Sequence, residues 1–413
     1  MEKIKIGFIG LGQRGFWLIR DTLPDLLKTD VEIVAVCNVY EDRIERAADC
    51  IEKNTGKRPI GTTDYHDILK MDEVQAVIIA AAWEVHVEMV IAAMKAGKYV
   101  GLEVGGAYSV DQCFELVKTH EETGVHCMFL ENCCYGKLEL LALNMARQGI
   151  FGDIVHCTGG YTHDLRQEVS DGEEIRHYRL LNYLNRNCDN YPTHQIGPIA
   201  KILDINNGNR FVSLVSMASP AKGLNEYVAD RKGADHKLAK AQFKQGDVVT
   251  SIIKCANGET ITITLETTLP ATYTRDFSLR GTKGGLYENT NSIFIDKEHN
   301  KHEWNPKLLW DNIKDYEEQY THPIWQNYEV KGGHGGMDWL VLSAFVEAVR
   351  NNERPPIDVY DAALWMAITP LSEMSIARGG APVDVPDFTR GKWMSREAVV
   401  KGKYCLDKVC EVK

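Results

Sequence analysis

The chain has 413 residues, of which 44% are hydrophobic and 25% are charged, and its formal net charge is -11. A chain of this length is too long for one compact core, so we expect two domains. The negative charge disfavours non-specific binding to nucleic acid or to anionic membranes, because both reward positive charge. Eleven cysteines without a Cys-x-x-Cys pair, no long apolar run and no export-signal core predict a cytoplasmic protein without a metal site or a membrane partner.

The first predicted strand, residues 3–9, runs directly into a glycine-rich turn, and an apolar helix through residues 16–19 follows. Its fingerprint residues are Gly10, Gly12, Gln13, Arg14 and Gly15. In this setting the first glycine allows a tight turn, the second lets the backbone approach a pyrophosphate, and the third lets helix and strand pack closely. The order strand, glycine turn, helix therefore predicts a dinucleotide site at this turn.

The second predicted strand, residues 31–37, ends at Asn38, where an acidic residue usually bonds the adenosine ribose. Asparagine can also bond a ribose hydroxyl. Glu41 and Asp42 lie close by, and no arginine directly follows Asn38. This local charge favours NAD over NADP.

Strand and helix patterns continue to alternate up to about residue 130, with strands at 74–82, 99–102 and 125–130 and helices at 87–96 and 110–123. This alternation predicts a doubly wound Rossmann domain over residues 1–132. Cofactors bind at the carboxyl ends of such strands, so we expect cofactor contacts from the residues there. These residues are Trp83, His86, Glu103, Val104 and Asn132. The alternative is that His86 and Asn132 are only polar groups at strand ends.

Residues 133–413 are predicted to form a second domain. A helix at 137–148 and a strand at 154–161 lead to a polar stretch, 162–190, which is either a solvated loop or part of a site. After a helix at 197–203, alternating strand-like runs predict an antiparallel sheet with one solvated face. The runs are 212–217, 248–254, 260–267, 276–281, 285–289 and 292–295, and two helices follow at 336–349 and 358–377. An exposed sheet face suggests burial against a second copy, so we expect a homo-oligomer.

The segment Tyr191-Pro-Thr-His194 places a phenol and an imidazole close together ahead of a predicted helix. Both groups transfer protons, and the pKa of histidine lies near neutral pH. A nicotinamide cofactor together with such groups is suited to oxidising a carbon that bears a hydroxyl. The alternative is a structural turn onto the helix, with Thr193 as its N-cap.

Several longer motifs carry a resemblance to a known family. They are Trp83-Glu-Val-His86, Glu103-Val104, Glu131-Asn132 with Cys134-Tyr135-Gly136, residues 160–166, residues 190–194 with Gly197-Pro198, and His334-Gly-Gly-Met-Asp338. With them the chain resembles the Gfo/Idh/MocA oxidoreductase superfamily and, within it, glycoside hydrolase family 109, the NAD-dependent alpha-N-acetylgalactosaminidases. The resemblance implies an α/β fold, with an N-terminal Rossmann domain followed by an α/β domain with an open, mostly antiparallel sheet.

Val104 separates this chain from the ordinary sugar dehydrogenases of the superfamily. Those enzymes carry Glu-Lys-Pro where this chain has Glu103-Val104-Gly105, and their lysine helps proton transfer. Valine transfers no proton, and the resemblance to family 109 implies this absence of the lysine. The chain departs from the family 109 pattern at Gln195-Ile196, where Gly-Leu is usual, and at Asn38, where Asp is usual.

The resemblance implies a redox-neutral glycosidase with a tightly bound, recycled NAD. The sugar is oxidised at carbon 3, the glycosidic oxygen leaves by elimination across carbons 1 and 2, water adds, and carbon 3 is reduced again. His194 is the expected base at carbon 3 and Tyr191 the second proton-transfer group, and the substrate is a small glycoside or oligosaccharide. The expected sugar contacts are Tyr161, Arg179, Thr193 and Tyr273. The alternatives are a sugar or polyol dehydrogenase with net redox chemistry and a non-catalytic NAD-binding sensor.

Overall fold

The computed structural model describes residues 2–300, 302–399 and 401–407. Two compact units make up the chain. The first unit combines Met1–Gly136 with two later segments, Ile324–Leu364 and Ala398–Lys408. The second unit combines Lys137–Pro323 with Trp365–Glu397. Segments far apart in the sequence therefore share the first unit.

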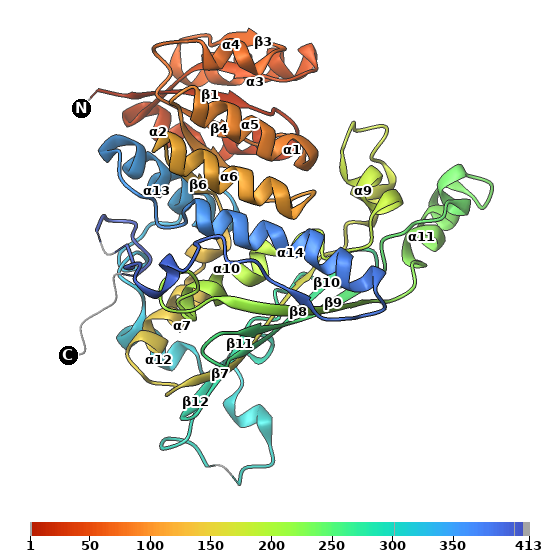
Figure 1. The fold of residues 1–413 in the computed structure, drawn as a ribbon, viewed down its shortest axis with the longest axis vertical. Helices are drawn as coiled ribbons and strands as arrows, with labels where there is room; N and C mark the ends of the chain where they lie inside the picture. Colours follow the sequence, from red (N-terminus) through yellow and green to blue (C-terminus); the bar gives the residue numbers. More distant parts are fainter. Residues whose placement is uncertain (1, 301, 400, 408–413) are drawn as a thin grey trace. The chain divides into compact units, whose positions relative to one another are not determined.

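A parallel sheet of six strands forms the centre of the first unit, in the order β3-β2-β1-β4-β5-β6 (Figure 1). Its strands are β1 (Ile4–Ile9), β2 (Val31–Cys37), β3 (Ile60–Thr62), β4 (Ala76–Ile79), β5 (Tyr99–Leu102) and β6 (Cys127–Phe129). All neighbouring pairs are parallel. This is the strand order of the doubly wound dinucleotide-binding fold, so the predicted Rossmann fold is confirmed.

Helices pack around this sheet. Apart from β3, which is exposed, its strands are largely buried and therefore read as apolar runs. The helices are α1 (Gln13–Trp17), the π-helix η1 (Leu18–Thr22), α2 (Leu23–Thr29), α3 (Glu41–Thr55), α4 (Tyr65–Leu69), α5 (Trp83–Lys95), α6 (Val110–Thr123), η2 (Asn132–Tyr135), η6 (His334–Gly336) and α13 (Met337–Asn351). The later helix α13 packs against η2, η1 and α2. Helix α5 begins at Trp83, earlier than predicted, so Trp83 and His86 lie on its first turn.

The second unit is built on a mixed sheet of eight strands, in the order β13-β12-β11-β7-β10-β9-β8-β14. Its strands are β7 (Ile154–Thr162), β8 (Phe211–Ala218), β9 (Val248–Cys255), β10 (Thr260–Glu266), β11 (Ser278–Gly281), β12 (Gly284–Tyr287), β13 (Ser292–Ile295) and β14 (Val383–Asp384). Strands β7 and β10 pair in parallel, and the other pairs are antiparallel. The expected mostly antiparallel sheet is thus confirmed.

The helices of the second unit position the polar segments of the sequence. They are α7 (Lys137–Arg147), α8 (Arg166–Ser170), α9 (Arg179–Asn185), α10 (Thr193–Ile202), α11 (Gly223–Lys232), η3 (Lys237–Lys240), η4 (Glu288–Thr290), η5 (Pro306–Leu309), α12 (Lys314–Tyr320) and η7 (Lys392–Met394). Helix α14 (Val359–Ala377) belongs to the first unit up to Leu364 and to the second from Trp365. The polar stretch 162–190 is not simply a solvated loop, because it contains α8 and α9 and buries Arg179, Asn182 and Asn190.

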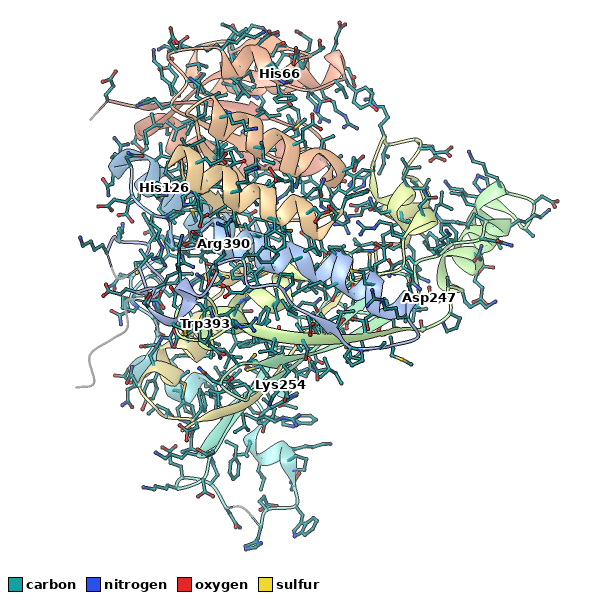
Figure 2. The ribbon with its side chains drawn as sticks, in the orientation of Figure 1. His66, His126, Asp247, Lys254, Arg390 and Trp393 are labelled. Atoms are coloured by element: carbon teal, nitrogen blue, oxygen red, sulfur yellow. The ribbon has the colours of Figure 1, made fainter. Side chains whose placement is uncertain are left out.

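Hydrogen bonds from polar side chains also hold loops in place inside the second unit. Asp247, labelled in Figure 2, accepts hydrogen bonds from the backbone N–H of Lys222 at 2.7 Å and from the Thr268 hydroxyl at 2.6 Å. The carboxylate therefore holds the start of α11 against the end of β10. No helix within the described ranges is both long enough and apolar enough to cross a membrane.

Candidate functional site

The glycine turn after β1 has the geometry of a phosphate cradle. Gly10 has a φ of 95°, which favours glycine, and a Cβ on Gly15 would lie 2.0 Å from the Gly10 carbonyl oxygen. A Cβ on Gly12 would meet one atom within 4 Å, Nη1 of Arg43 at 3.6 Å. The backbone at Gly12 is therefore open to a close ligand, whereas Gly15 allows helix and strand to touch.

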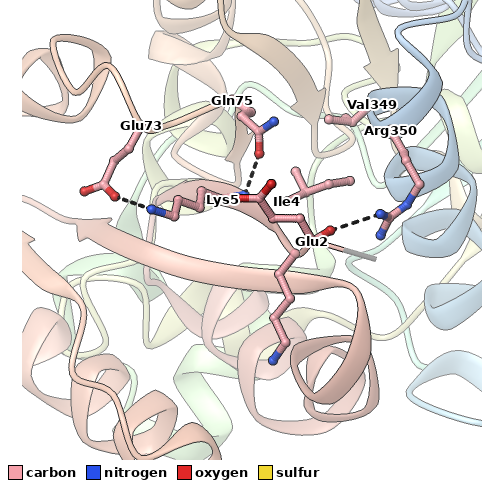
Figure 3. Close-up of a pocket in the computed structure, with 8 residues that line it drawn as sticks. Glu2, Ile4, Lys5, Glu73, Gln75, Val349 and Arg350 are labelled. Atoms are coloured by element: carbon pink, nitrogen blue, oxygen red, sulfur yellow. Dashed lines mark hydrogen bonds and ion pairs between the residues drawn. The ribbon is translucent and has the colours of Figure 1, made fainter.

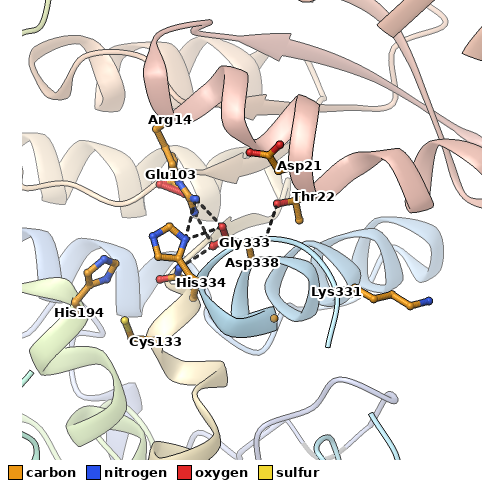
Figure 4. A network of polar contacts seen from close by, with 12 residues as sticks. Arg14, Asp21, Thr22, Glu103, Cys133, His194, Lys331, Gly333, His334 and Asp338 are labelled. Atoms are coloured by element: carbon orange, nitrogen blue, oxygen red, sulfur yellow. Dashed lines mark hydrogen bonds and ion pairs between the residues drawn. The ribbon is translucent and has the colours of Figure 1, made fainter. Parts of the chain in front are cut away.

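Arg14 of the fingerprint is the centre of an ionic network (Figure 4). Its guanidinium donates to Glu103 at 3.0 Å and to both oxygens of Asp338, at 2.7 and 2.9 Å. Asp338 also accepts from the Asn132 amide at 2.7 Å and pairs with Nδ1 of His334 at 2.8 Å. Arg14 and Asn132 are thus joined through the Asp338 carboxylate, which was not predicted from the sequence, and Glu103 joins them through Arg14.

Three more predicted cofactor residues, Asn38, Trp83 and Val104, follow the ends of β2, β4 and β5. The side-chain oxygen of Asn38 accepts the backbone N–H of Tyr40 at 3.0 Å, which makes a tight turn after β2. Trp83 and Val104 are buried, and a Cβ on Gly105 would lie 2.3 Å from the Trp83 ring. The indole therefore packs directly under the backbone that follows β5.

Two buried acceptors in the first unit fit a ligand that offers hydrogen-bond donors. Oδ1 of Asn132 and Nδ1 of His86 have no hydrogen-bond partner among the described residues. Nε2 of His86 lies 2.7 Å from the Ala81 carbonyl oxygen, and burial lowers the pKa of His86 to about 4, so the neutral ring donates from Nε2 and Nδ1 is an acceptor. NAD supplies ribose hydroxyl and carboxamide N–H donors, and with the glycine cradle these acceptors fit that cofactor.

A surface pocket lies at the opposite, amino-terminal end of β1 (Figure 3). Lys5 pairs there with Glu73 at 2.8 Å, and Arg350 donates to the Glu2 carbonyl at 3.1 Å. Ligands of parallel α/β sheets bind at the carboxyl ends of the strands instead. We therefore assign no function to this pocket.

The second unit brings four predicted residues into one aromatic cluster. The Tyr191 hydroxyl and Nε2 of His194 lie 3.3 Å apart. The Tyr161 ring lies 4.7 Å from the Tyr191 ring and 5.5 Å from the His194 ring. The Tyr273 ring lies 6.2 Å from that of Tyr161. Three phenols and an imidazole, which are proton-transfer groups, thus lie together, from β7, from the segment that leads into α10 and from the loop between β10 and β11.

Arg179 joins this cluster from α9. Its guanidinium carbon lies 5.0 Å from the Tyr191 ring centroid, and its Nε lies 2.9 Å from the Glu168 carboxylate. Burial opposes the charge of Arg179, but Glu168 outweighs this, and the pKa of Arg179 is raised well above its usual value. Arg179 therefore stays charged and can stabilise negative charge on a bound sugar.

A buried carboxyl supports the backbone of the Tyr191–His194 segment. Asp189 accepts the Gln195 amide at 3.0 Å and the Tyr191 backbone N–H at 3.4 Å. The prediction that Thr193 is the helix N-cap is wrong, because Pro192 occupies that position. The Thr193 hydroxyl is fully buried without a hydrogen bond to a described residue, so its proposed sugar contact stays a prediction.

Three residues at these sites were not singled out from the sequence: His163, Asp189 and Asp338. The spacing of Tyr161 and His163 could have revealed the first, because residues two apart on a strand share a face. Asp338 stands in one of the quoted motifs, but nothing local indicates its bonds to Arg14 and Asn132. Asp189 reads only as a polar residue in a loop.

Two family models match the chain and together cover most of its length. Residues 4–130 match the oxidoreductase family with an NAD-binding Rossmann fold. Residues 135–395 match the C-terminal domain of glycosyl hydrolase 109.

Known proteins similar to this chain include members of the same family. An alpha-N-acetylgalactosaminidase from Tannerella forsythia is 42% identical, and the match covers 95% of this chain and 88% of that protein. A glycosyl hydrolase family 109 protein from Parabacteroides distasonis is 40% identical over 96% of this chain and 89% of its own. Among solved structures, a levoglucosan dehydrogenase in complex with NADH and levoglucosan has a TM-score of 0.69 at 16% identity, covering 94% of this chain and 100% of that one. The last likeness shows the fold alone.

Proposed function

The chain belongs to glycosyl hydrolase family 109, and on that premise we propose that it hydrolyses glycosides with NAD as a recycled cofactor. The observation that carries the proposal is the Tyr191–His194 pair, 3.3 Å apart within the aromatic cluster. The strand-end residue where the related dehydrogenases have lysine is Val104, so proton transfer falls to this cluster. We propose an N-acetylgalactosamine-like glycoside as the substrate, by analogy with the relative from Tannerella forsythia.

Bound NAD would accept a hydride from carbon 3 of the sugar and return it at the end of the cycle. In the first unit, the Gly12 backbone would approach its pyrophosphate, and Asn132 and His86 would accept hydrogen bonds from it. Glu103 and Asp338 hold Arg14 in place beside this cradle. The residues of the first unit would therefore bind and orient the cofactor.

The second unit supplies the groups that move protons. His194 takes the proton of the carbon 3 hydroxyl as that carbon is oxidised. A ketone at carbon 3 acidifies the hydrogen on carbon 2, so a modest base suffices there. Tyr191, in hydrogen-bond contact with His194, passes a proton to the leaving oxygen. Arg179 stabilises the enolate charge, and Tyr161 and Tyr273 contact the sugar.

A panel of nitrophenyl glycosides of both anomers tests this proposal. The purified protein should release nitrophenol without added NAD and without net NADH at 340 nm, and denaturation should release about one equivalent of NAD per chain. In deuterated water the product sugar should carry deuterium at carbon 2, because elimination removes that proton. Product without deuterium would contradict elimination and favour direct displacement at carbon 1.

The second candidate function is a sugar or polyol dehydrogenase, because the levoglucosan dehydrogenase has a similar fold. Net NADH formation with a free monosaccharide, without release of nitrophenol, would favour it. A non-catalytic sensor would bind NAD and a sugar but turn over neither. The same panel therefore separates all three.

We further propose a cytoplasmic, homo-oligomeric enzyme. No disulfide joins any two of the ten cysteines within the described residues, as in a reducing compartment. Exposed apolar side chains on the second sheet support the oligomer, because a second copy could bury them. They include Val155 on β7, Met217 on β8 and Ile252 on β9. Cell fractionation tests the compartment, and light scattering of the purified protein tests the oligomer; a secreted or strictly monomeric protein would contradict these expectations.

A further inference from the structure

A second phenol–imidazole pair lies beside the Tyr191–His194 pair. The Tyr161 hydroxyl and Nδ1 of His163 lie 2.9 Å apart. β7 ends at Thr162, but the backbone N–H of His163 still donates to the Glu266 carbonyl at 2.9 Å, which holds the imidazole at a fixed place beyond the strand end. Tyr161 and His163 are two residues apart and share one face.

The two pairs come from different elements and meet through their phenols. The rings of Tyr161 and Tyr191 lie 4.7 Å apart, so the two hydroxyls belong to one cluster. The His163 ring also makes an edge contact with Tyr273 at 5.2 Å. Four proton-transfer groups in two hydrogen-bonded pairs exceed what a single oxidation of a hydroxyl requires.

The surroundings keep His163 neutral. Burial lowers the pKa of His163, and the positive charge of Arg179 and the His194 imidazole lower it further, while Glu168 and Asp164 act in the opposite direction. A neutral imidazole has one nitrogen that accepts a hydrogen bond. Nδ1 of His163 can therefore receive the phenolic proton of Tyr161.

We propose that His163 is a positioning residue that makes Tyr161 the base for the hydrogen on carbon 2, so that Tyr161–His163 is a second proton-transfer pair. This inference rests on the proposed glycosidase function, because only elimination needs a base at carbon 2. His194 then serves carbon 3, and each of the two proton demands of the reaction has its own pair.

The step balances as follows. As the C2–H bond breaks, its proton passes to the Tyr161 oxygen and the phenolic proton passes to Nδ1 of His163. The C2–H electron pair forms the double bond between carbons 1 and 2, and the C1–O bond breaks. The leaving oxygen takes, through Tyr191, the proton that His194 received from the carbon 3 hydroxyl. The proton on Tyr161 exchanges with solvent before water adds. Water then adds to carbon 1 and gives a proton to His194 through Tyr191, while Tyr161 protonates carbon 2 and takes back the proton held on Nδ1 of His163. His194 finally returns its proton to the carbon 3 oxygen as that carbon is reduced.

His163→Gln tests the role, because glutamine keeps a side-chain acceptor for the Tyr161 hydroxyl but takes up no proton. With the NAD-loaded enzyme and a nitrophenyl glycoside, we expect KM within about threefold of wild type and kcat about 100-fold lower. The acid limb of the kcat–pH profile that reports a neutral base should disappear. Oxidation at carbon 3 should continue, so enzyme-bound NADH at 340 nm should accumulate while nitrophenol does not appear.

Two further variants keep the test decisive if that one does not fold. Tyr161→Phe should show the same accumulation of bound NADH, and the double variant should be no slower than Tyr161→Phe, because groups that act as a unit are not additive. His156→Gln is the matched control. His156 lies on the opposite face of β7 and pairs with Thr260 at 2.9 Å, so its variant should behave as wild type.

The outcomes separate this inference from the proposed function. A His163→Gln enzyme with a wild-type rate and pH profile overturns the inference while leaving the glycosidase intact. A variant that forms no bound NADH also overturns it, because the block would then precede oxidation. If the wild-type enzyme itself releases no nitrophenol, the proposed function fails first.

Discussion

Replacing Asp338 by Asn should weaken the first unit by several kcal/mol. The carboxylate of Asp338 is 2% exposed and receives four hydrogen bonds, two from Arg14 and one each from Asn132 and His334. An Asn in the same place offers a single oxygen. If that oxygen takes the position of Oδ1, the bonds to Nη1 of Arg14 and to His334 are lost.

The size of the loss follows from those two bonds. A hydrogen bond to a charged group contributes about 1.5–3 kcal/mol, so the expected loss is about 3–6 kcal/mol. For a unit of this size, that corresponds to a fall in melting temperature of roughly 6–24 °C. Arg14 keeps its pair with Glu103, so the fold should persist, but the cofactor cradle should retain less NAD.

The same carboxylate makes a pH-dependent contribution. Burial alone would raise the pKa of Asp338, but the hydrogen bonds and charges of His334 and Arg14 outweigh it and hold the pKa well below its usual value. A carboxyl whose pKa is lowered on folding adds stability above its unfolded pKa of about 4, and this is lost as the pH falls further. The Asn variant should therefore lose less stability than wild type between pH 5 and pH 3.

Thermal unfolding of the NAD-loaded proteins at pH 7 measures the effect, with NAD content per chain as a second readout. Asp49→Asn is the matched control. Asp49 pairs with Arg58 at 2.7 Å, but its side chain is 70% exposed, so its variant should change stability by no more than about 0.5 kcal/mol. A melting temperature for Asp338→Asn within 2 °C of that control would refute the reasoning.

Three further predictions follow from the two sites. Gly15→Ala should lose bound NAD, because its Cβ would lie 2.0 Å from the Gly10 carbonyl oxygen. In the control Gly56→Ala the Cβ would meet no atom within 4 Å, so this variant should lose only about 1–2 kcal/mol of stability and keep its NAD, and equal NAD contents in the two variants would contradict the prediction. Burial raises the pKa of Asp189 from 3.8 to about 7, so the folded protein holds the carboxyl proton more tightly than the unfolded chain does, and the free energy of unfolding should fall by up to about 4 kcal/mol as the pH rises from 4 to 7. In Asp189→Asn, the urea midpoint should not show this fall. If the midpoint of the variant falls with pH as steeply as that of wild type, Asp189 does not cause the fall. His194→Ala should lower kcat about a hundredfold to ten-thousandfold with NAD still bound, and turnover within a few-fold of wild type would make His194 merely structural.

The amino-acid sequence determined the elements whose signal is local. The run of β1 into Gly10, Gly12 and Gly15 specifies a strand, a turn and a helix through short-range sterics, so the cofactor cradle could be predicted without a fold. Alternating apolar residues likewise predicted most strands of the second sheet. The Tyr191–His194 pair was predictable because both residues lie within four positions of one another.

Tertiary structure alone decided which distant residues meet. Asp338 reaches Arg14 and Asn132 because the segment from Ile324 folds back into the first unit, which no periodicity reveals. The parallel pairing of β7 with β10 depends on strand order, since alternation sets which face is buried but does not choose the neighbour. The approach of the Tyr161 and Tyr191 rings depends in turn on how α10 packs against β7, where a Cβ on Gly159 would lie 3.0 Å from that of Gln195. Local sequence sets the conformation of each segment, but contacts between segments are set by burial of their apolar faces, and it is those contacts that pair the proton-transfer groups.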